Sequence, residues 1–487
     1  MNKMLPILMC LLLSVQVNAQ QRLLSLDSCR SLALRNNKQL KISRNQLLSS
    51  EYEHKAARTN YLPKIGIDAA YIWNQKSTHL LSKDTRNKLE TMGNTAGAGL
   101  AEQAQMLAQQ YPQLIPLIES LGGPMTQALN GLGKQIVDAF KTSTYNMYAG
   151  SLMLTQPLYL GGRIRAYDKI TKYTTELLGA GVDAQTEETI YSTDQAYWQV
   201  VSLASKKELA EAYVAMLQKL DGDIQKMYSE GVTTKAGTLT VRVKLNEAEM
   251  TLTKVTDGLS LARMLLCQLC GLPIHEEVVL CDEGKMELSL PVAELSTDTL
   301  AAFSQRSDLK ALSQGILIAD EGVKIARASQ LPSISAFAGY SLTNPNVYNG
   351  FKNDWAGNMS LGLALHLPID LWGASRNRIK TARLQAENQR YLYEDAKEKI
   401  NLQINQAKFK VEEANKKLVM TERNLEKANE NLHYADVGFH EGVIATADLL
   451  EAQTAWLQAR SERLDAEIDV RMAQLYLQKS MGNLRWK

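Results

Sequence analysis

The sequence predicts a mainly helical protein with a few membrane strands, built from two internal repeats. Three observations support this prediction: very long apolar helical seams, short alternating segments before them, and recurrence of the same order in the second half. The longest helical stretch, 163–271, has one break, at Tyr228-Ser229-Glu230-Gly231-Val232. Because glycine takes backbone shapes that other residues resist, the stretch predicts an antiparallel helical hairpin.

The second arm of this hairpin keeps apolar or small residues at alternating spacings of four and three. They are Val241, Leu245, Ala248, Leu252, Val255, Leu259, Ala262, Leu266 and Leu269. Such a seam needs a partner helix along its whole length. At 1.5 Å per residue the first arm would reach roughly 90 Å, which suits a fibrous scaffold or a structure that spans a wide gap.

The second half of the chain repeats the first. Leu40, Arg58, Leu62 and Pro63 recur at one constant offset as Leu309, Arg327, Leu331 and Pro332. Pro157, Gly162, Arg165, Gly231, Val232, Leu239 and Gly271 recur at a second offset as Pro368, Gly373, Arg376, Gly442, Val443, Leu450 and Gly482. Two constant offsets indicate an internal duplication. The difference between them measures an insertion in the first strand-to-strand loop.

The repeats predict the domain boundaries. Residues 1–19 form a signal peptide, 20–271 the first repeat, 272–295 a linker and 296–487 the second repeat. In the first repeat a helix leads to strands 64–74 and 146–158, which flank the insertion 75–145, and then to the hairpin 163–271. In the second repeat a helix leads to strands 333–343 and 358–368 and then to the hairpin 373–482.

The N-terminus predicts export from the cytoplasm. Lys3 precedes the apolar run 4–15, and Val17-Asn18-Ala19 offers small residues for cleavage before Gln20. Cys10 could mark a lipid anchor, but Met9 is larger than the residue that usually precedes a lipidated cysteine. After the signal no apolar run reaches the length of a membrane helix, so a spanning chain would have to cross as strands.

Composition and motifs argue against several other classes. The formal net charge of +2 over 487 residues gives no sign of a nucleic-acid partner. Cys29, Cys267, Cys270 and Cys281 are too few and too irregular for a disulfide framework. The spacing of Cys267 and Cys270 favours packing in a helical seam over a redox or metal pair. With scattered histidines and no catalytic motif, we expect no enzyme, no cofactor and no metal site.

The predicted strands are about ten residues long and apolar on one face, as tilted membrane strands are. In the first of them, this face carries Ile65, Ile67, Ala69, Tyr71 and Trp73. A soluble sandwich would show the same alternation, but here the strand pairs adjoin very long helices in an exported chain. Four strands cannot close a barrel and lipid tolerates no open sheet edge, so several chains would have to share one. The hairpins would then continue the barrel as a hollow helical tube.

Several motifs in this doubled order resemble the TolC-like outer-membrane efflux proteins, the outer-membrane factors of tripartite pumps. They are Leu62-Pro63, Gln156-Pro157-Leu158-Tyr159-Leu160-Gly161-Gly162, Tyr228-Ser229-Glu230-Gly231, Phe439-His440-Glu441-Gly442 and Asp448-Leu449-Leu450-Glu451. The resemblance covers almost the whole mature chain outside the insertion. It implies a homotrimer with a shared twelve-strand β-barrel and an α-barrel tunnel. Such a trimer would lie in the outer membrane of a Gram-negative bacterium, with a long periplasmic extension.

The resemblance also implies a function. The protein would be the passive exit duct of a tripartite efflux or type I secretion system. Its partners would be outer-membrane lipid, a periplasmic adaptor (membrane fusion protein) and an inner-membrane pump of the resistance-nodulation-division or ABC type. The rival hypothesis is a secreted coiled-coil envelope scaffold or adaptor without a pore. The insertion would face outside the cell, where we favour a packed rim loop over a lid or a partner site.

The resemblance implies two sets of site residues at the hairpin tips. The adaptor would dock on Tyr228, Gly231, Val232, Phe439, Gly442 and Val443. Asp448 and Glu451 would form a cation-selective constriction, because three copies would place rings of negative charge around one axis. The alternative is that both residues are merely carboxylates in the early part of a helix, where the helix dipole favours negative charge. Gly237 stands where relatives often have an acid, so a network between the two tips is in doubt.

Overall fold

The computed structural model describes residues 22–76, 80–110, 115–141, 144–284, 299–349 and 352–484. The predicted signal peptide with Cys10, and residues 285–295 of the predicted linker, lie outside these ranges. The chain forms two compact units. The helical unit contains the residues up to Ala57, Ala166–Lys324 and Arg376–Lys487, and the strand unit contains Arg58–Arg165 and Ile325–Ser375. Each unit therefore takes matching pieces from both sequence repeats.

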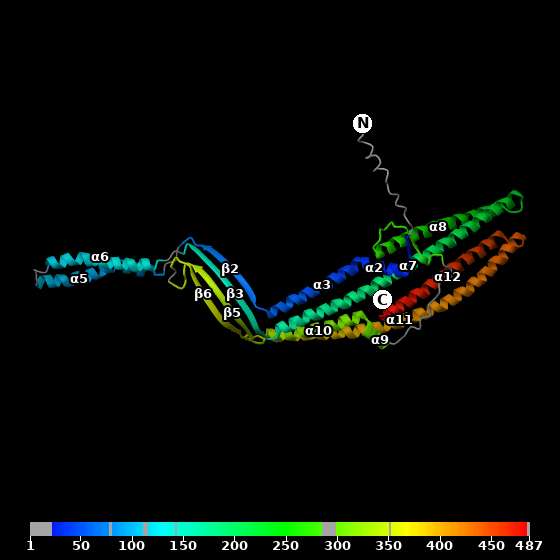
Figure 1. Cartoon of the computed structure of the whole chain (residues 1–487). Coiled ribbons are helices and arrows are strands. Elements are labelled where there is room, and N and C mark those ends of the chain that lie inside the picture. The colour runs from blue at the N-terminus through cyan, green and yellow to red at the C-terminus, as the bar shows by residue number, and fades with distance from the viewer. Residues whose placement is uncertain are drawn as a thin grey trace, which may run out of the picture. The chain divides into compact units, whose positions relative to one another are not determined.

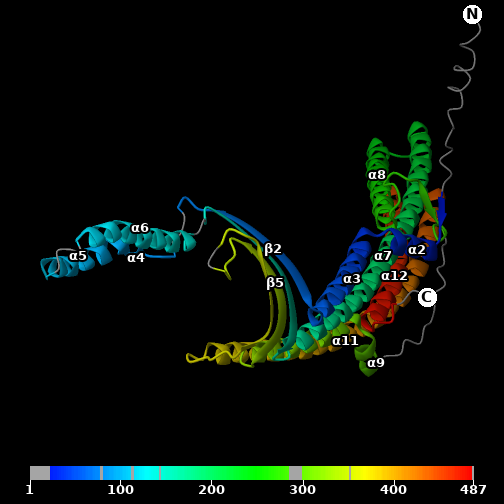
Figure 2. The same ribbon diagram turned by 60° about the vertical axis from the view of Figure 1, so that its left-hand side comes forward.

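The helical unit is built on two long hairpins, α7–α8 in green and α11–α12 in orange and red (Figures 1 and 2). Their helices are α7 (Arg163–Ser229), α8 (Lys235–Cys270), α11 (Ala374–His440) and α12 (Thr446–Ser480). The shorter helices are α2 (Leu26–Asn36), α3 (Lys38–Arg58), α9 (Thr299–Gln305) and α10 (Ser307–Ala328). α7 and α11 have 67 residues each, so the two repeats give arms of equal length. None of the described helices is both long enough and apolar enough to cross a membrane.

A short parallel pair of strands joins the start of the chain to the predicted linker. β1 (Arg22–Leu24) pairs with β4 (Val278–Leu280), beside a core that contains Tyr197, Cys267 and Cys270. The two cysteines are almost fully buried among apolar side chains, and burial raises the pKa of the Cys267 thiol. They pack there as small hydrophobic residues.

One ion pair lies deep in the helical unit. The Asp194 carboxylate on α7 is 1% exposed and accepts two hydrogen bonds from the Arg30 guanidinium on α2, at 2.7 Å and 2.5 Å. Arginine presents two parallel donors that match the two oxygens of a carboxylate. The pair ties the first helix of the described chain to the middle of the long arm α7.

The strand unit contains one antiparallel sheet of four strands in the order β2-β3-β5-β6. The strands are β2 (Lys64–Trp73), β3 (Asn146–Leu160), β5 (Ser333–Asn344) and β6 (Ala356–His366). β3 runs beyond the predicted end at residue 158 through an irregularity between Pro157 and Tyr159. β6 starts and ends two residues earlier than the predicted 358–368, and its end lies just before Pro368, which has no N–H to donate to a sheet.

The register of the sheet gives it two different faces. Ile67, Leu152, Tyr340 and Met359 are aligned across the four strands. The next row, on the opposite face, contains Asp68, Ser151, Ser341 and Asn358. Apolar side chains of the first face are exposed, with Ile67 at 80% and Met359 at 72%. An exposed apolar face opposite a polar one is what a strand between lipid and water requires.

The predicted insertion is helical. It contains α4 (Lys83–Glu90), α5 (Met92–Gln110) and α6 (Ile115–Ala139), drawn in cyan in Figure 1. The backbone N–H of Asn74 donates to the carbonyl of Tyr145 at 2.8 Å, which closes the insertion where β2 and β3 end. The insertion is thus a helical hairpin, and its role as a packed rim loop outside the cell stays a prediction.

Candidate functional site

The first hairpin tip is a tight reversal between α7 and α8. Gly231 has a φ of 74°, in the left-handed region that glycine enters without a steric penalty. Its N–H donates to the carbonyl of Tyr228 at 3.1 Å, and the N–H of Val232 donates to the carbonyl of Met227 at 2.8 Å. These bonds satisfy the carbonyls that the end of α7 would otherwise leave unpaired. The Thr234 hydroxyl then accepts the N–H of Gly237 at 3.3 Å and caps α8.

The second tip repeats this geometry between α11 and α12. Gly442 also has a φ of 74°. Its N–H donates to the carbonyl of Phe439 at 3.1 Å, and the N–H of Val443 donates to the carbonyl of Gly438 at 2.8 Å. A Cβ at Gly438 would lie 2.7 Å from the Ile444 side chain, so the chain closes on itself there. The two tips are therefore the same turn, built twice by the repeated sequence.

A single apolar cluster holds the two tips together. Leu217 and Ile224 of α7, Val241 of α8, Phe439 of α11 and Leu449 of α12 all belong to it. Leu217, Ile224 and Val241 are completely buried. Four helices therefore share one close-packed core beside the tips.

The six predicted docking residues fall into different environments. Val232 is 69% exposed and Val443 is 81% exposed, so each tip presents an apolar side chain to solvent. Tyr228 is half exposed, whereas its counterpart Phe439 is 6% exposed and packs inside the cluster. Phe439 can thus shape the tip, but little of its ring surface is exposed for a partner to contact. The two glycines contribute their backbone conformation.

Asp448 and Glu451 lie near the start of α12, one helical turn apart. Both side chains are exposed, while Leu449, Leu450 and Ala452 between and beside them are buried. In the described part of the chain neither carboxylate forms an ion pair. The two acids therefore share one solvent-facing side of the helix, as either the constriction or the helix-dipole reading requires.

A groove of about 370 Å³ lies beside the tips, between α7, α11 and α12. Phe439 and His440 line one part of it, and Lys219, Asp223 and Asp436 bring charges to it. Its residues are Met216, Lys219, Leu220, Asp223, Asn429, Leu432, His433, Asp436, Phe439, His440, Leu449 and Gln453. Gln453 is 3% exposed, and its amide oxygen accepts no hydrogen bond from the described residues.

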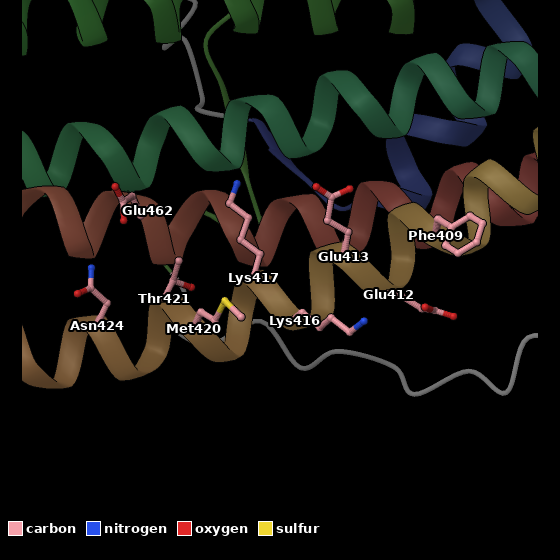
Figure 3. Close-up of a pocket in the computed structure, with 9 residues that line it drawn as sticks. All are labelled: Phe409, Glu412, Glu413, Lys416, Lys417, Met420, Thr421, Asn424 and Glu462. Carbon is pink, nitrogen blue, oxygen red and sulfur yellow. The ribbon is translucent and has the colours of Figure 1, made fainter.

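A larger open pocket of about 740 Å³ runs along α11, farther from the tip (Figure 3). Phe409, Glu412, Glu413, Lys416, Lys417, Met420, Thr421 and Asn424 line it from α11, and Glu462 lines it from α12. Phe409 is 70% exposed and Met420 is 68% exposed. Lysines and glutamates therefore lie beside exposed apolar side chains along this side of α11.

Several residues that build the tips were not predicted from the sequence. Thr234 could have been found from its place before α8, since threonine is a favoured helix cap. Gly438 and Ile444 had no signal, because their contact depends on the closure of the turn. Gln453 also had none, since its burial depends on three packed helices. Among the described residues, no group of histidine, cysteine and acidic side chains is arranged to hold a metal ion.

Comparisons with known proteins agree with this architecture. The family model described as "Outer membrane efflux protein" matches residues 29–272 and 301–483. The chain is similar to the Campylobacter jejuni CmeC outer membrane channel, with 15% identity, a TM-score of 0.74 and coverage of 94% of this chain and 85% of that one. It is also similar to the outer membrane protein VceC of Vibrio cholerae, with 15% identity, a TM-score of 0.70 and coverage of 94% and 96%.

A curated relative is Protein CyaE of Bordetella pertussis, 25% identical over 257 residues. That alignment covers 52% of this chain and 53% of CyaE, so the chain spans about half the length of this relative. The predicted fold class and the predicted family are confirmed by the family model and the structural matches. The family and the fold are those of channel proteins rather than of enzymes. Since the family model covers both repeats, the chain belongs to the outer membrane efflux protein family.

Proposed function

We propose that the protein is a passive exit duct in the outer membrane, through which a tripartite efflux or type I secretion system releases its substrates. One observation supports this above all: a four-stranded sheet with an apolar and a polar face, in a chain that also contains two long helical hairpins. No metal or nucleotide is needed in such a duct, because the energy for transport comes from a pump.

The proposed duct needs several copies because the sheet has two open edges, and the family resemblance implies that there are three. β2 and β6 are the outer strands, and within the described residues each pairs with one other strand. Lipid does not tolerate unpaired strand edges, so β2 of one copy would pair with β6 of the next. Three copies would close a twelve-strand barrel with the Ile67 row toward lipid and the Asp68 row toward the lumen. Neighbouring copies would also cover the exposed Phe409 and Met420 of α11.

The proposed partners follow from the tips. Val232 and Val443 present apolar side chains to solvent, at the ends of turns whose backbone is firmly hydrogen-bonded. A rigid turn with an exposed apolar residue suits docking, since little conformational entropy is lost on binding. We assign this role to a periplasmic adaptor, which would connect the duct to an inner-membrane pump of the resistance-nodulation-division or ABC type.

Membrane fractionation and bilayer recordings test the proposal. The mature protein should be extracted from outer membranes only by detergent, should run as a trimer, and should conduct ions in a planar bilayer. A coiled-coil scaffold without a pore would instead be released by buffer or salt and would give no conductance. A monomer that stays in solution without detergent and conducts no ions would refute the duct.

Replacing both Asp448 and Glu451 by alanine should lower the cation-to-anion permeability ratio several-fold. Three copies would lose two rings of carboxylates from the narrow end of the tunnel, which would remove the field that attracts cations. Reversal potentials under a salt gradient give this ratio. As a control, the double variant Glu422→Ala with Glu426→Ala removes the same amount of charge from α11, several helical turns before the tip. It should leave the permeability ratio almost unchanged.

If the helix-dipole reading is correct, the outcome is different. The double alanine variant would then keep its ion preference and lose about 0.3–1 kcal/mol of stability for each carboxylate. An unchanged permeability ratio would remove Asp448 and Glu451 from the proposed constriction.

A further inference from the structure

The helical insertion between β2 and β3 has an unusual division of side chains between its inner and outer surfaces. α5 and α6 face each other through small and polar residues. A Cβ at Gly93 of α5 would lie 2.3 Å from the carbonyl oxygen of Thr126 on α6, and one at Gly133 of α6 would lie 1.8 Å from the carbonyl oxygen of Leu89 on α4. The N–H of Gly93 donates to the amide oxygen of Asn130 at 2.8 Å. The helices therefore close mainly on glycines and polar groups; Val137 is buried with them, but other large apolar side chains of α6 are not.

Those large side chains lie on the outside of α6 instead. We define the α6 stripe as Leu121, Met125, Ala128, Leu132 and Ile136, which are spaced by four, three, four and four residues. At 100° per residue they share an arc of roughly 80° on the helix. All five are exposed, with Leu121 at 58% and Leu132 at 51%. This seam pattern is typical of a helix that packs along a second helix.

The charge distribution makes the stripe suitable for another apolar surface. From the start of α5 to the end of α6, residues 92–139, the charged side chains are Glu102, Glu119, Lys134 and Asp138. None of the four belongs to the α6 stripe. A helical hairpin whose outer surface faced only water would carry charged side chains on that surface. The stripe therefore lacks the feature that would keep two copies apart.

The position of the insertion in the chain indicates which surface meets the stripe. The insertion directly follows β2, which is an edge strand of the sheet. The N–H of Asn74 and its side-chain amide hold the last turn of the insertion through the carbonyls of Tyr145 and Thr144, at 2.8 Å and 2.7 Å. In the proposed trimer, β2 is the strand that pairs with the next copy. Each hairpin thus leaves the barrel at a junction between copies, and three identical hairpins share a high local concentration.

We propose that the α6 stripe is a homotypic interface, through which the α5–α6 hairpins of the three copies bind one another outside the membrane. This inference depends on the proposed trimeric duct. It adds a second interface to the trimer, at the strand end opposite the helical tunnel, and the occupant of the stripe is the same stripe of a second copy. A surface partner of another kind or a lipid headgroup layer would be the alternatives that the experiment excludes.

Cysteine cross-linking on intact cells tests the proposal with two adjacent positions. Ala128 lies in the stripe, and Gln127 is exposed at the same height on another side of α6. With a short bismaleimide, Ala128→Cys should give a covalent dimer band on a denaturing gel, because each trimer can form one pair. Gln127→Cys and the wild-type chain should remain monomeric. Adding Leu132→Glu to Ala128→Cys should reduce the dimer band at least tenfold, since it places three negative charges in the interface.

The outcomes separate this inference from the proposed function. In every variant, the trimer is first verified by native gel electrophoresis in detergent. Trimers with no cross-link at Ala128→Cys, or with equal cross-linking at Gln127→Cys, would overturn the homotypic interface while leaving the duct intact. Absence of trimers in the wild type would refute the duct itself. Leu132→Glu should also lower the temperature at which the trimer dissociates in mild detergent, and an unchanged temperature would count against the interface.

Discussion

Gly442→Val should abolish efflux while the protein still reaches the outer membrane as a trimer. Gly442 has a φ of 74°, and its N–H closes the end of α11 on the carbonyl of Phe439. A side chain in the left-handed region costs about 1–2 kcal/mol, and a β-branched one more, so the turn would open. Because Val443 follows directly, the apolar side chain proposed to dock the adaptor would be displaced. Drug susceptibility of a strain that depends on this duct measures the loss.

A matched control isolates the conformation of the turn from the added bulk. Gly222 lies inside α7 with no atom within 4 Å of a Cβ placed there, and it has no positive φ. Gly222→Val should therefore preserve efflux, with at most a small loss of helix stability. Normal resistance in the Gly442→Val strain, with normal amounts of trimer, would contradict docking at this tip. Gly231→Val tests the first tip in the same way.

Arg30→Ala should lower the free energy of unfolding by about 3–5 kcal/mol, the usual cost of leaving one partner of a buried ion pair alone. The Asp194 carboxylate is 1% exposed and would lose both hydrogen bonds from the guanidinium. Thermal unfolding of the detergent-solubilised protein, followed by circular dichroism, measures the change. Replacing both partners, with Arg30→Met and Asp194→Leu, should recover most of the loss because no charge then remains buried.

A surface pair provides the control for this prediction. Lys417 and Asp469 also form an ion pair, at 2.8 Å, but their side chains are 48% and 50% exposed. Lys417→Ala should cost less than about 1 kcal/mol, because water solvates the remaining carboxylate. Equal losses of unfolding free energy in Arg30→Ala and Lys417→Ala would show that the burial of Asp194 does not increase the cost of losing its partner.

The effect of Arg30→Ala should also depend on pH. Burial is the larger influence on Asp194 and raises its pKa above the ordinary 3.8, although Arg30 lowers it. Without Arg30 the pKa of the folded state rises further. For a carboxyl whose folded pKa exceeds its unfolded one, stability falls as pH rises from the unfolded pKa through the folded pKa. The variant should therefore be destabilised less at pH 5 than at pH 8, and a pH-independent loss would contradict this account.

The tips show how far local sequence reasoning reaches. Gly231 and Gly442 were predicted as turns because glycine alone tolerates the left-handed conformation, and both have it. The same reasoning treated Tyr228 and Phe439 as equivalent, since the repeat aligns them. In the structure Tyr228 is half exposed and Phe439 is buried. Which of two aligned rings faces solvent depends on the four-helix cluster around it, which no local pattern encodes.

The sheet was easier to predict from local sequence patterns than the insertion. Alternation along a strand is a local property, so it predicted the strands and the division of their faces. In the insertion the helical signal is broken into short patches, because glycines and prolines interrupt it and such residues are typical of loops. Only the packed structure shows that Leu121, Met125 and Leu132 of α6 lie on the outside, because each is more than half exposed there.

By itself, the sequence determined the repeat, the order of strands and hairpins, and the two turning points, since each depends on the spacing of residues along the chain. The tertiary structure alone decided the sheet register that aligns Asp68 with Asn358 across four strands, and the pairing of Arg30 with Asp194. It also decided which side of α6 remained uncovered. These contacts join residues far apart in the chain, so they exist only once packing has excluded the alternative partners.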